Sequence, residues 1–96
     1  MARYIALANW TDKGIANVKE SPERVNAVRT LAKNLGCELQ DFYMTVGAYD
    51  MVVTIEAPDD EAMAKLALSI GRAGNVRTTT LKAFSEESFR KIIADL

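Results

Sequence analysis

The sequence predicts an α+β domain with the ferredoxin-like order β-α-β-β-α-β and one further helix at the C-terminal end. The first observation behind this prediction is that four apolar, strand-like runs alternate with two apolar stripes at helical spacing. The second is a short loop around Gly47, because strands joined by so short a loop pair as antiparallel neighbours. The third is a length of 96 residues without a linker or a repeat, so residues 1–96 are expected to form a single domain.

The first strand is expected over residues 3–9, an apolar run that ends at the polar loop 10–14. The first helix is expected to begin at Ser21, which would act as the N-cap, with Pro22 at the first helical position. Gly36 then ends this helix, because a glycine readily adopts the conformation that follows a helix. The apolar residues between these limits share one helical face: Val25, Val28, Leu31, Ala32 and Leu35.

The most informative segment is the loop of the central hairpin, whose strands are expected over residues 37–45 and 50–57. Gly47 supplies a backbone angle that other residues avoid. Tyr49 and Asp50 come shortly after it and form a compact polar pair in an otherwise apolar neighbourhood. This loop is therefore the first candidate for a site that faces a ligand.

A second helix is expected to begin at residues 58–60, where acidic side chains suit the positive end of the helix. Its apolar stripe consists of Ala62, Met63, Leu66, Ala67 and Ile70. A fourth strand is expected over residues 75–84, and a short last helix over residues 86–94 with Ser85 as its cap. The apolar face of the last helix, formed by Phe89, Ile92 and Ile93, is expected to cover the chain's own sheet or to dock on a neighbour.

Right-handed crossovers place both main helices on one face of a single antiparallel sheet. From the alternation of side chains along a strand, we expect these to face the helices: Phe42, Met44, Met51, Val53, Ile55, Thr79, Leu81 and Ala83. We expect these on the opposite face: Tyr4, Ala6, Trp10, Tyr43, Thr45, Val52, Thr54, Glu56, Val76, Thr78, Thr80 and Lys82. This mixture of apolar and polar groups suits a sheet that pairs with a second copy around a polar-lined pocket, so a homodimeric α+β barrel is predicted.

The composition excludes several classes of function. The formal net charge is −1 and the basic residues are scattered, so a nucleic acid is not expected as a partner. The chain has no histidine and a single cysteine, Cys37, so no metal site, cofactor or histidine-based triad is expected, and the thiol is expected to be inert. No apolar run approaches the roughly 20 residues that cross a bilayer. The N-terminal residues lack a signal-peptide layout. A cytoplasmic location is therefore expected, and association with a membrane is not.

Six stretches of the chain carry a resemblance to a known family: Tyr4-Ile5-Ala6-Leu7, Trp10-Thr11-Asp12-Lys13-Gly14-Ile15, Ser21-Pro22-Glu23-Arg24, Gly47-Ala48-Tyr49-Asp50, Glu56-Ala57-Pro58-Asp59-Asp60 and Gly74-Asn75-Val76-Arg77-Thr78-Thr79-Thr80-Leu81. In these stretches and their order the chain resembles the GYD domain family, small bacterial proteins named for a Gly, Tyr, Asp signature. The resemblance implies the dimeric α+β barrel superfamily, in agreement with the predicted topology. It implies no reaction, because that superfamily includes effector-binding domains, cofactor-free monooxygenases, isomerases and haem enzymes.

The candidate binding residues follow the first strand, surround the hairpin loop and open the fourth strand: Trp10, Thr11, Lys13, Tyr43, Tyr49, Asp50, Arg77 and Thr78. Trp10 offers a flat wall for a ligand, and Arg77 offers a fork for a carboxylate or phosphate. Three of these residues could instead have a purely structural role. Asp50 could stabilise the turn, Trp10 could close one end of the barrel, and Arg77 could form an ion pair with an acidic side chain. Glu56 and Lys82 are expected to form an exposed ion pair across the sheet.

Three functions remain open at this point. The first is a homodimeric small-molecule binding module without catalysis, since no acid–base or nucleophile set is recognisable. The second is a cofactor-independent monooxygenase or isomerase for a small aromatic or enolisable compound, with Tyr49 and Asp50 as the catalytic candidates. The third is a structural or assembly protein that acts through its surface.

Overall fold

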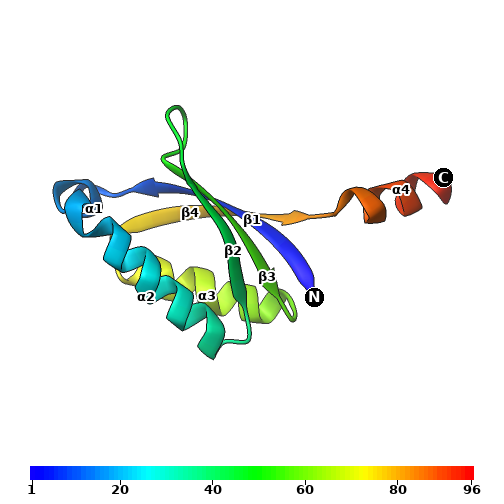
Figure 1. Ribbon diagram of the computed structural model, residues 1–96, viewed down its shortest axis with the longest axis horizontal. Helices are drawn as coiled ribbons and strands as arrows, with labels where there is room; N and C mark the ends of the chain where they lie inside the picture. Colours follow the sequence, from blue (N-terminus) through cyan, green and yellow to red (C-terminus); the bar gives the residue numbers. More distant parts are fainter.

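The computed structural model describes residues 1–96, in which one four-stranded sheet carries two long helices on one face (Figure 1). The elements in chain order are β1 (Ala2–Trp10), α1 (Asp12–Ala16), a 3-10 helix (Val18–Glu20), α2 (Ser21–Asn34), β2 (Glu38–Met44), β3 (Met51–Ala57), α3 (Asp60–Arg72), β4 (Val76–Ala83) and α4 (Glu86–Ala94). All neighbouring strands are antiparallel, in the order β2-β3-β1-β4. This is the ferredoxin-like α+β arrangement that the sequence predicts.

Local signals in the sequence determine the end of α2 and the starts of α3 and α4, as predicted. The Asp59 side chain accepts a hydrogen bond of 2.8 Å from the Ala62 N–H and so caps α3. The Ser85 hydroxyl accepts a hydrogen bond of 3.1 Å from the Ser88 N–H at the start of α4. Gly36 follows α2 with a φ of 77°, a left-handed conformation that favours glycine.

The segment between β1 and α2 differs from the prediction, which placed a polar loop over residues 10–14 and a cap at Ser21. Thr11 caps the short helix α1, because its hydroxyl oxygen accepts a hydrogen bond of 3.1 Å from the Gly14 N–H. Ser21 is the first residue of α2 and makes no capping bond. Its hydroxyl oxygen instead accepts hydrogen bonds from Trp10 of β1 and from Arg24 of the same helix, so Ser21 joins α2 to β1.

The hydrophobic core lies between the sheet and the helices α2 and α3. Ile55 of β3 and Leu66 of α3 are fully buried there, and Met63 of α3 and Ala32 of α2 pack into the same cluster. The predicted apolar stripes of both helices therefore face the sheet.

The face assignment made from the sequence is correct for β2 and β3 but wrong for β1 and β4. Tyr4 lies opposite Ile55 in the β1–β3 ladder and opposite Lys82 in the β1–β4 ladder. Ile55 is buried under the helices, so every second residue from Tyr4 faces the helices too. The helix-facing set therefore includes Tyr4, Ala6, Ala8, Trp10, Val76, Thr78, Thr80 and Lys82. The open face carries Arg3, Ile5, Leu7, Asn9, Tyr43, Val52, Thr54, Glu56, Arg77, Thr79, Leu81 and Ala83.

Helix α4 follows the end of β4 and extends away from the rest of the molecule (Figure 1). Its apolar residues Phe89, Ile92 and Ile93 are about half exposed and do not cover the chain's own sheet. None of the helices has both the length and the apolar character that crossing a bilayer requires.

Candidate functional site

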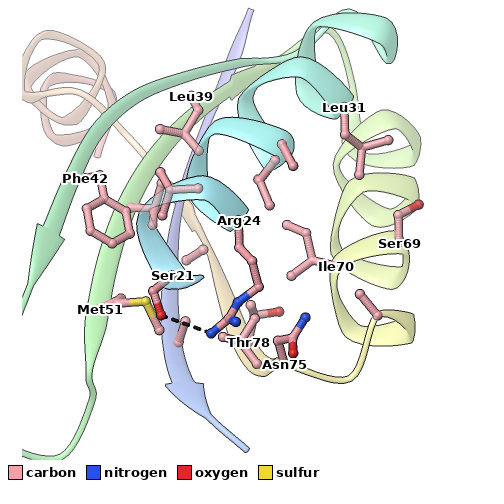
Figure 2. A pocket seen from close by; sticks show the side chains of 18 of the residues that line it. Ser21, Arg24, Leu31, Leu39, Phe42, Met51, Ser69, Ile70, Asn75 and Thr78 are labelled. Carbon is pink, nitrogen blue, oxygen red and sulfur yellow. Dashed lines mark hydrogen bonds between the residues drawn. The ribbon is translucent and has the colours of Figure 1, made fainter. Parts of the chain in front are cut away.

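An apolar cavity of about 310 Å³ lies between the sheet and helices α2 and α3 (Figure 2). On the sheet side its wall includes Ala6 and Ala8 of β1, whose small side chains leave the space open. On the helix side Val28 and Leu31 of α2 and Ile70 of α3 face it. Of the 20 lining residues 15 are hydrophobic, so the body of the cavity suits an apolar molecule.

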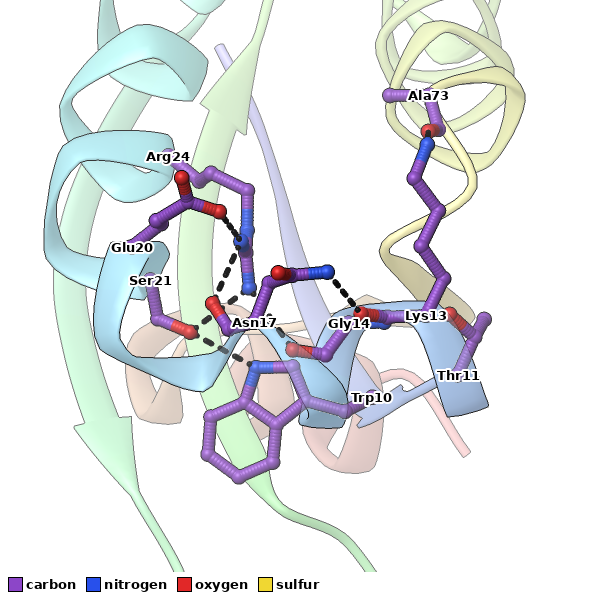
Figure 3. Close-up of polar contacts among 9 residues, drawn as sticks. All are labelled: Trp10, Thr11, Lys13, Gly14, Asn17, Glu20, Ser21, Arg24 and Ala73. Carbon is purple, nitrogen blue, oxygen red and sulfur yellow. Dashed lines mark hydrogen bonds and ion pairs between the residues drawn. The ribbon is translucent and has the colours of Figure 1, made fainter.

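One end of the cavity is polar because Trp10, Ser21 and Arg24 meet there (Figure 3). The Ser21 hydroxyl oxygen accepts hydrogen bonds from Trp10 Nε1 at 3.1 Å and from Arg24 Nη2 at 3.0 Å. The guanidinium also donates to the backbone carbonyl oxygens of Gly14, at 3.2 Å, and of Asn17, at 3.0 Å. Asn75 and Thr78 also line the cavity, and Figure 2 draws them at the same end as the Arg24 head group, so β1, α2 and β4 all contribute to this end.

Helix α1 is held against the loop that precedes β4, and this contact positions Asn75. The Thr11 N–H donates to the Asn75 carbonyl oxygen at 3.0 Å, and the Thr11 hydroxyl donates to the Gly74 carbonyl oxygen at 2.6 Å. Lys13 Nζ donates to the Ala73 carbonyl oxygen at 3.3 Å, next to the C-terminal end of α3 (Figure 3). The backbone of α1 and the backbone of the loop before β4 approach so closely that only a glycine fits at position 14.

Of the candidate residues, the structure brings Trp10 and Thr78 to the cavity wall. Thr11 and Lys13 lie behind that wall and bind the loop before β4. Tyr43 is 60% exposed on the open sheet face, away from the cavity. The eight candidates therefore do not form one site.

Asp50 takes the structural role that was the alternative to ligand binding. Its Oδ2 atom accepts a hydrogen bond of 3.0 Å from the Trp10 N–H. Its own N–H donates to the Ala8 carbonyl oxygen at 2.9 Å and lies 3.1 Å from Asn9 Oδ1. Tyr49 joins the hairpin loop through its carbonyl oxygen, which accepts from the Thr45 hydroxyl at 2.6 Å. Asp50 thus ties the hairpin to the end of β1.

The expected ion pairs of Glu56, Lys82 and Arg77 are wrong. Glu56 binds Arg3 at 2.8 Å on the open face, whereas Lys82 binds Asp60 at 3.2 Å on the helix side. Strand β1 separates β3 from β4, so Glu56 and Lys82 cannot meet across the sheet. Arg77 alternates onto the open face in register with Asn9, but the end of its side chain reaches Gly71 of α3, and it forms neither a hydrogen bond nor an ion pair within the chain.

Sequence reasoning missed Ser21 and Arg24 as lining residues of a cavity. Both lie in the first turn of α2, and their spacing of three residues places them on one helical face. That spacing was the available signal. It was obscured because Ser21 was interpreted as the N-cap of the helix.

A second polar cluster joins Tyr4 of β1, Asp60 of α3 and Lys82 of β4. The Tyr4 hydroxyl donates a hydrogen bond to Asp60, which raises the pKa of Tyr4 to about 12. The same hydrogen bond, together with Lys82, holds the pKa of the Asp60 carboxyl below its ordinary value. Elsewhere, burial raises the pKa of the Cys37 thiol, so this cysteine stays protonated at neutral pH, as an inert thiol does.

Tyr4→Phe is expected to flatten the dependence of folding stability on pH at both extremes. In the wild type the raised pKa of Tyr4 contributes stability below pH 10.0, and this contribution is lost as the pH rises towards about 12. The lowered pKa of Asp60 contributes stability above pH 3.8, which is lost as the pH falls below that value. Urea unfolding at several pH values measures both slopes. Tyr43→Phe is the control, and identical slopes for Tyr4→Phe and the wild type would contradict the assignment.

The family model for the GYD domain matches residues 4–93 of the chain. A protein of Thermus thermophilus is 33% identical to the chain over 84 residues, which make up 86% of this chain and 88% of that relative. The relative is described as a glutamine synthetase and cystathionine beta-lyase binding protein.

Three solved structures resemble this one in fold. MtbAldR has a TM-score of 0.68 and 15% sequence identity; the match covers 88% of this chain but 52% of that chain, so this chain spans about half its length. FFRP-DM1 has a TM-score of 0.64 and 16% identity, with 88% of this chain and 100% of that chain covered. A hypothetical protein from Pyrococcus horikoshii has a TM-score of 0.63 and 16% identity, with 88% and 92% covered. At these identities the likeness concerns the fold alone, and it agrees with the ferredoxin-like arrangement.

Proposed function

The chain belongs to the GYD domain family, and on this premise we propose that it is a homodimeric module that binds a small molecule in the cavity between its sheet and helices. The cavity of about 310 Å³ is the observation that carries the proposal. The cavity opens to solvent, so its apolar walls stay in contact with water unless a molecule occupies it, which is unfavourable. Small-molecule sites have this size, with an apolar lining and a few polar groups that fix the orientation of the ligand.

The second part of the proposal is that two copies of the chain dimerise through their open sheet faces. No helix covers this face, and its apolar side chains include Ile5, Leu7, Val52 and Leu81. A sheet with an apolar face is stable when another layer covers that face, and a second copy provides a self-complementary one. The polar-lined pocket that the sequence predicts between the two sheets stays a prediction, with Asn9 and Thr54 among the polar groups there.

Native mass spectrometry of the untagged protein, purified from cells without dialysis, tests both parts. We expect a dimer that carries a discrete additional mass. Leu7→Glu is expected to yield monomers, because it places a charge in the contact between the sheets. Leu68→Glu is the matched control, because Leu68 is 74% exposed on α3. A wild-type monomer at micromolar concentration would contradict the pairing, and a dimer that binds no apolar compound would contradict the cavity's function.

A second candidate function is the binding of a metabolic enzyme, favoured by the relative from Thermus thermophilus and its described partners. The apolar face of α4, formed by Phe89, Ile92 and Ile93, is the surface proposed for this contact. Size-exclusion chromatography with purified glutamine synthetase tests it. Co-elution with the full chain, and its loss when residues 85–96 are removed, would support this function. Separate elution of the full chain would count against it.

The enzyme hypothesis has less support from the site. Asp50 does not line the cavity, because its carboxylate binds the backbone of Trp10. Tyr49 likewise lies outside the cavity wall. We therefore place ligand binding before catalysis.

A further inference from the structure

We propose that the ligand of the cavity is a monocarboxylate with an apolar body, whose carboxylate group lies at the polar end beside Arg24. This inference names the class of ligand and rests on the small-molecule function proposed above. It is argued from the size of the cavity, from its single charge and from the polar atoms that remain free at that end.

The volume and the apolar lining of the cavity determine how large the apolar body of the ligand can be. A cavity of roughly 150 Å³ with an apolar lining holds one benzene molecule. The cavity described here has about 310 Å³, so the ligand body corresponds to about two such rings or to a medium-length alkyl chain. Leu31, Leu39, Phe42 and Ile55 contribute to the apolar wall that such a body would contact.

Arg24 is the only charged residue among those that line the cavity, and no acidic residue is among them. Its hydrogen-bond partners are neutral, namely the carbonyl oxygens of Gly14 and Asn17 and the hydroxyl of Ser21. Glu20 lies 3.7 Å away, but its side chain is 68% exposed, so solvent screens most of its charge. The guanidinium therefore leaves one largely uncompensated positive charge at this end, which favours one anionic group.

The polar end also has free hydrogen-bonding atoms at suitable positions. Arg24 Nε, the Asn75 amide and the Thr78 hydroxyl form no hydrogen bonds within the chain. All three residues line the cavity, and Figure 2 draws them at the same end of it. The two Nη atoms are fixed by their bonds to the backbone, so the guanidinium is held in place before a ligand arrives, which lowers the entropic cost of binding. A single carboxylate matches this set in charge and in its capacity to accept several hydrogen bonds.

A comparison of octanoate with octanamide tests the inference, since the two compounds have nearly the same shape and differ in charge. Trp10 is the only tryptophan of the chain and lines the cavity, so its fluorescence reports binding, and calorimetry measures the affinity. We expect octanoate to bind at least about tenfold more tightly than octanamide, the effect of one charge-assisted hydrogen bond. Arg24→Gln is expected to abolish this preference while octanamide still binds. Arg29→Gln is the matched control, because Arg29 is exposed on the same helix and does not line the cavity.

Each outcome decides one part of the proposal. Equal binding of the two compounds to the wild type, or a preference for octanoate that persists in Arg24→Gln, would overturn the carboxylate assignment and leave the small-molecule function intact. Binding of neither compound would contradict the proposed function itself. If Arg24→Gln does not fold, the wild-type comparison still decides the charge preference. Thr78→Val, which keeps the side-chain shape, then locates the carboxylate and is expected to weaken octanoate binding severalfold.

Discussion

Gly14→Ala is expected to destabilise the protein by about 3 kcal/mol or more, at the upper end of the cost of overpacking. A Cβ atom at position 14 would lie 1.9 Å from the Asn75 carbonyl oxygen. This oxygen belongs to the backbone and also accepts the hydrogen bond from the Thr11 N–H, so it cannot move away without breaking that bond. Urea unfolding followed by circular dichroism measures the loss.

Gly71→Ala is the matched control for this substitution. A Cβ atom at position 71 would meet only Arg77 Nη1, at 3.1 Å, which is the end of a long, exposed side chain that can move. An alanine in a helix is about 1 kcal/mol more favourable than a glycine, so we expect Gly71→Ala to be neutral or to stabilise the protein. Equal losses for the two variants would show that α1 is not seated on the loop before β4 as described.

Leu66→Ala is expected to cost about 3 kcal/mol, within the range of leucine truncations in protein cores. Leu66 is fully buried in the cluster between α3 and the sheet, and the substitution removes apolar contacts and leaves a void. Leu68→Ala on the same helix removes the same atoms from a side chain that is 74% exposed, so we expect little change. Both variants should be unfolded at one fixed protein concentration, because dimerisation would couple stability to concentration. A cost for Leu66→Ala no larger than that for Leu68→Ala would contradict the core assignment.

The order of the elements and most of their limits follow from local signals. Gly36, Asp59 and Ser85 act at helix ends through their own backbone or side chain, independently of the rest of the fold. The apolar stripes of α2 and α3 were predicted because one face of each helix is buried. Such features can be recognised within a few residues of the chain.

The faces of β1 and β4 could not be assigned in this way. In β1 both sets of alternating residues are apolar, with Tyr4 and Ala6 in one and Ile5 and Leu7 in the other. In β4 threonines occur in both sets, so alternation alone does not identify the buried side. The pairing partners decide it, because Tyr4 lies opposite the buried Ile55. Register is a property of two strands together.

The cavity was not predictable because no residue pattern encodes an empty space. It lies where the small Ala6 and Ala8 of β1 face helices α2 and α3. The polar end depends equally on tertiary contacts, since Ser21 and Arg24 converge with Trp10 from another element. The sequence identified Trp10 and Thr78 as candidates, and it gave no reason to place them beside α2.

The hydrogen bond between Asp50 and Trp10 connects two regions that lie on different elements. Trp10 is held by its backbone at the hairpin and by its indole at α2, and the ring between these two attachments forms part of the cavity wall. A molecule that bound the hairpin and displaced it would move that wall as well, as long as the hydrogen bond to Trp10 is kept. By thermodynamic reciprocity, a ligand in the cavity would then change the affinity of the hairpin for such a molecule by the same factor. Binding at the Gly-Ala-Tyr-Asp loop and binding in the cavity would then be coupled, although the loop does not contact the ligand.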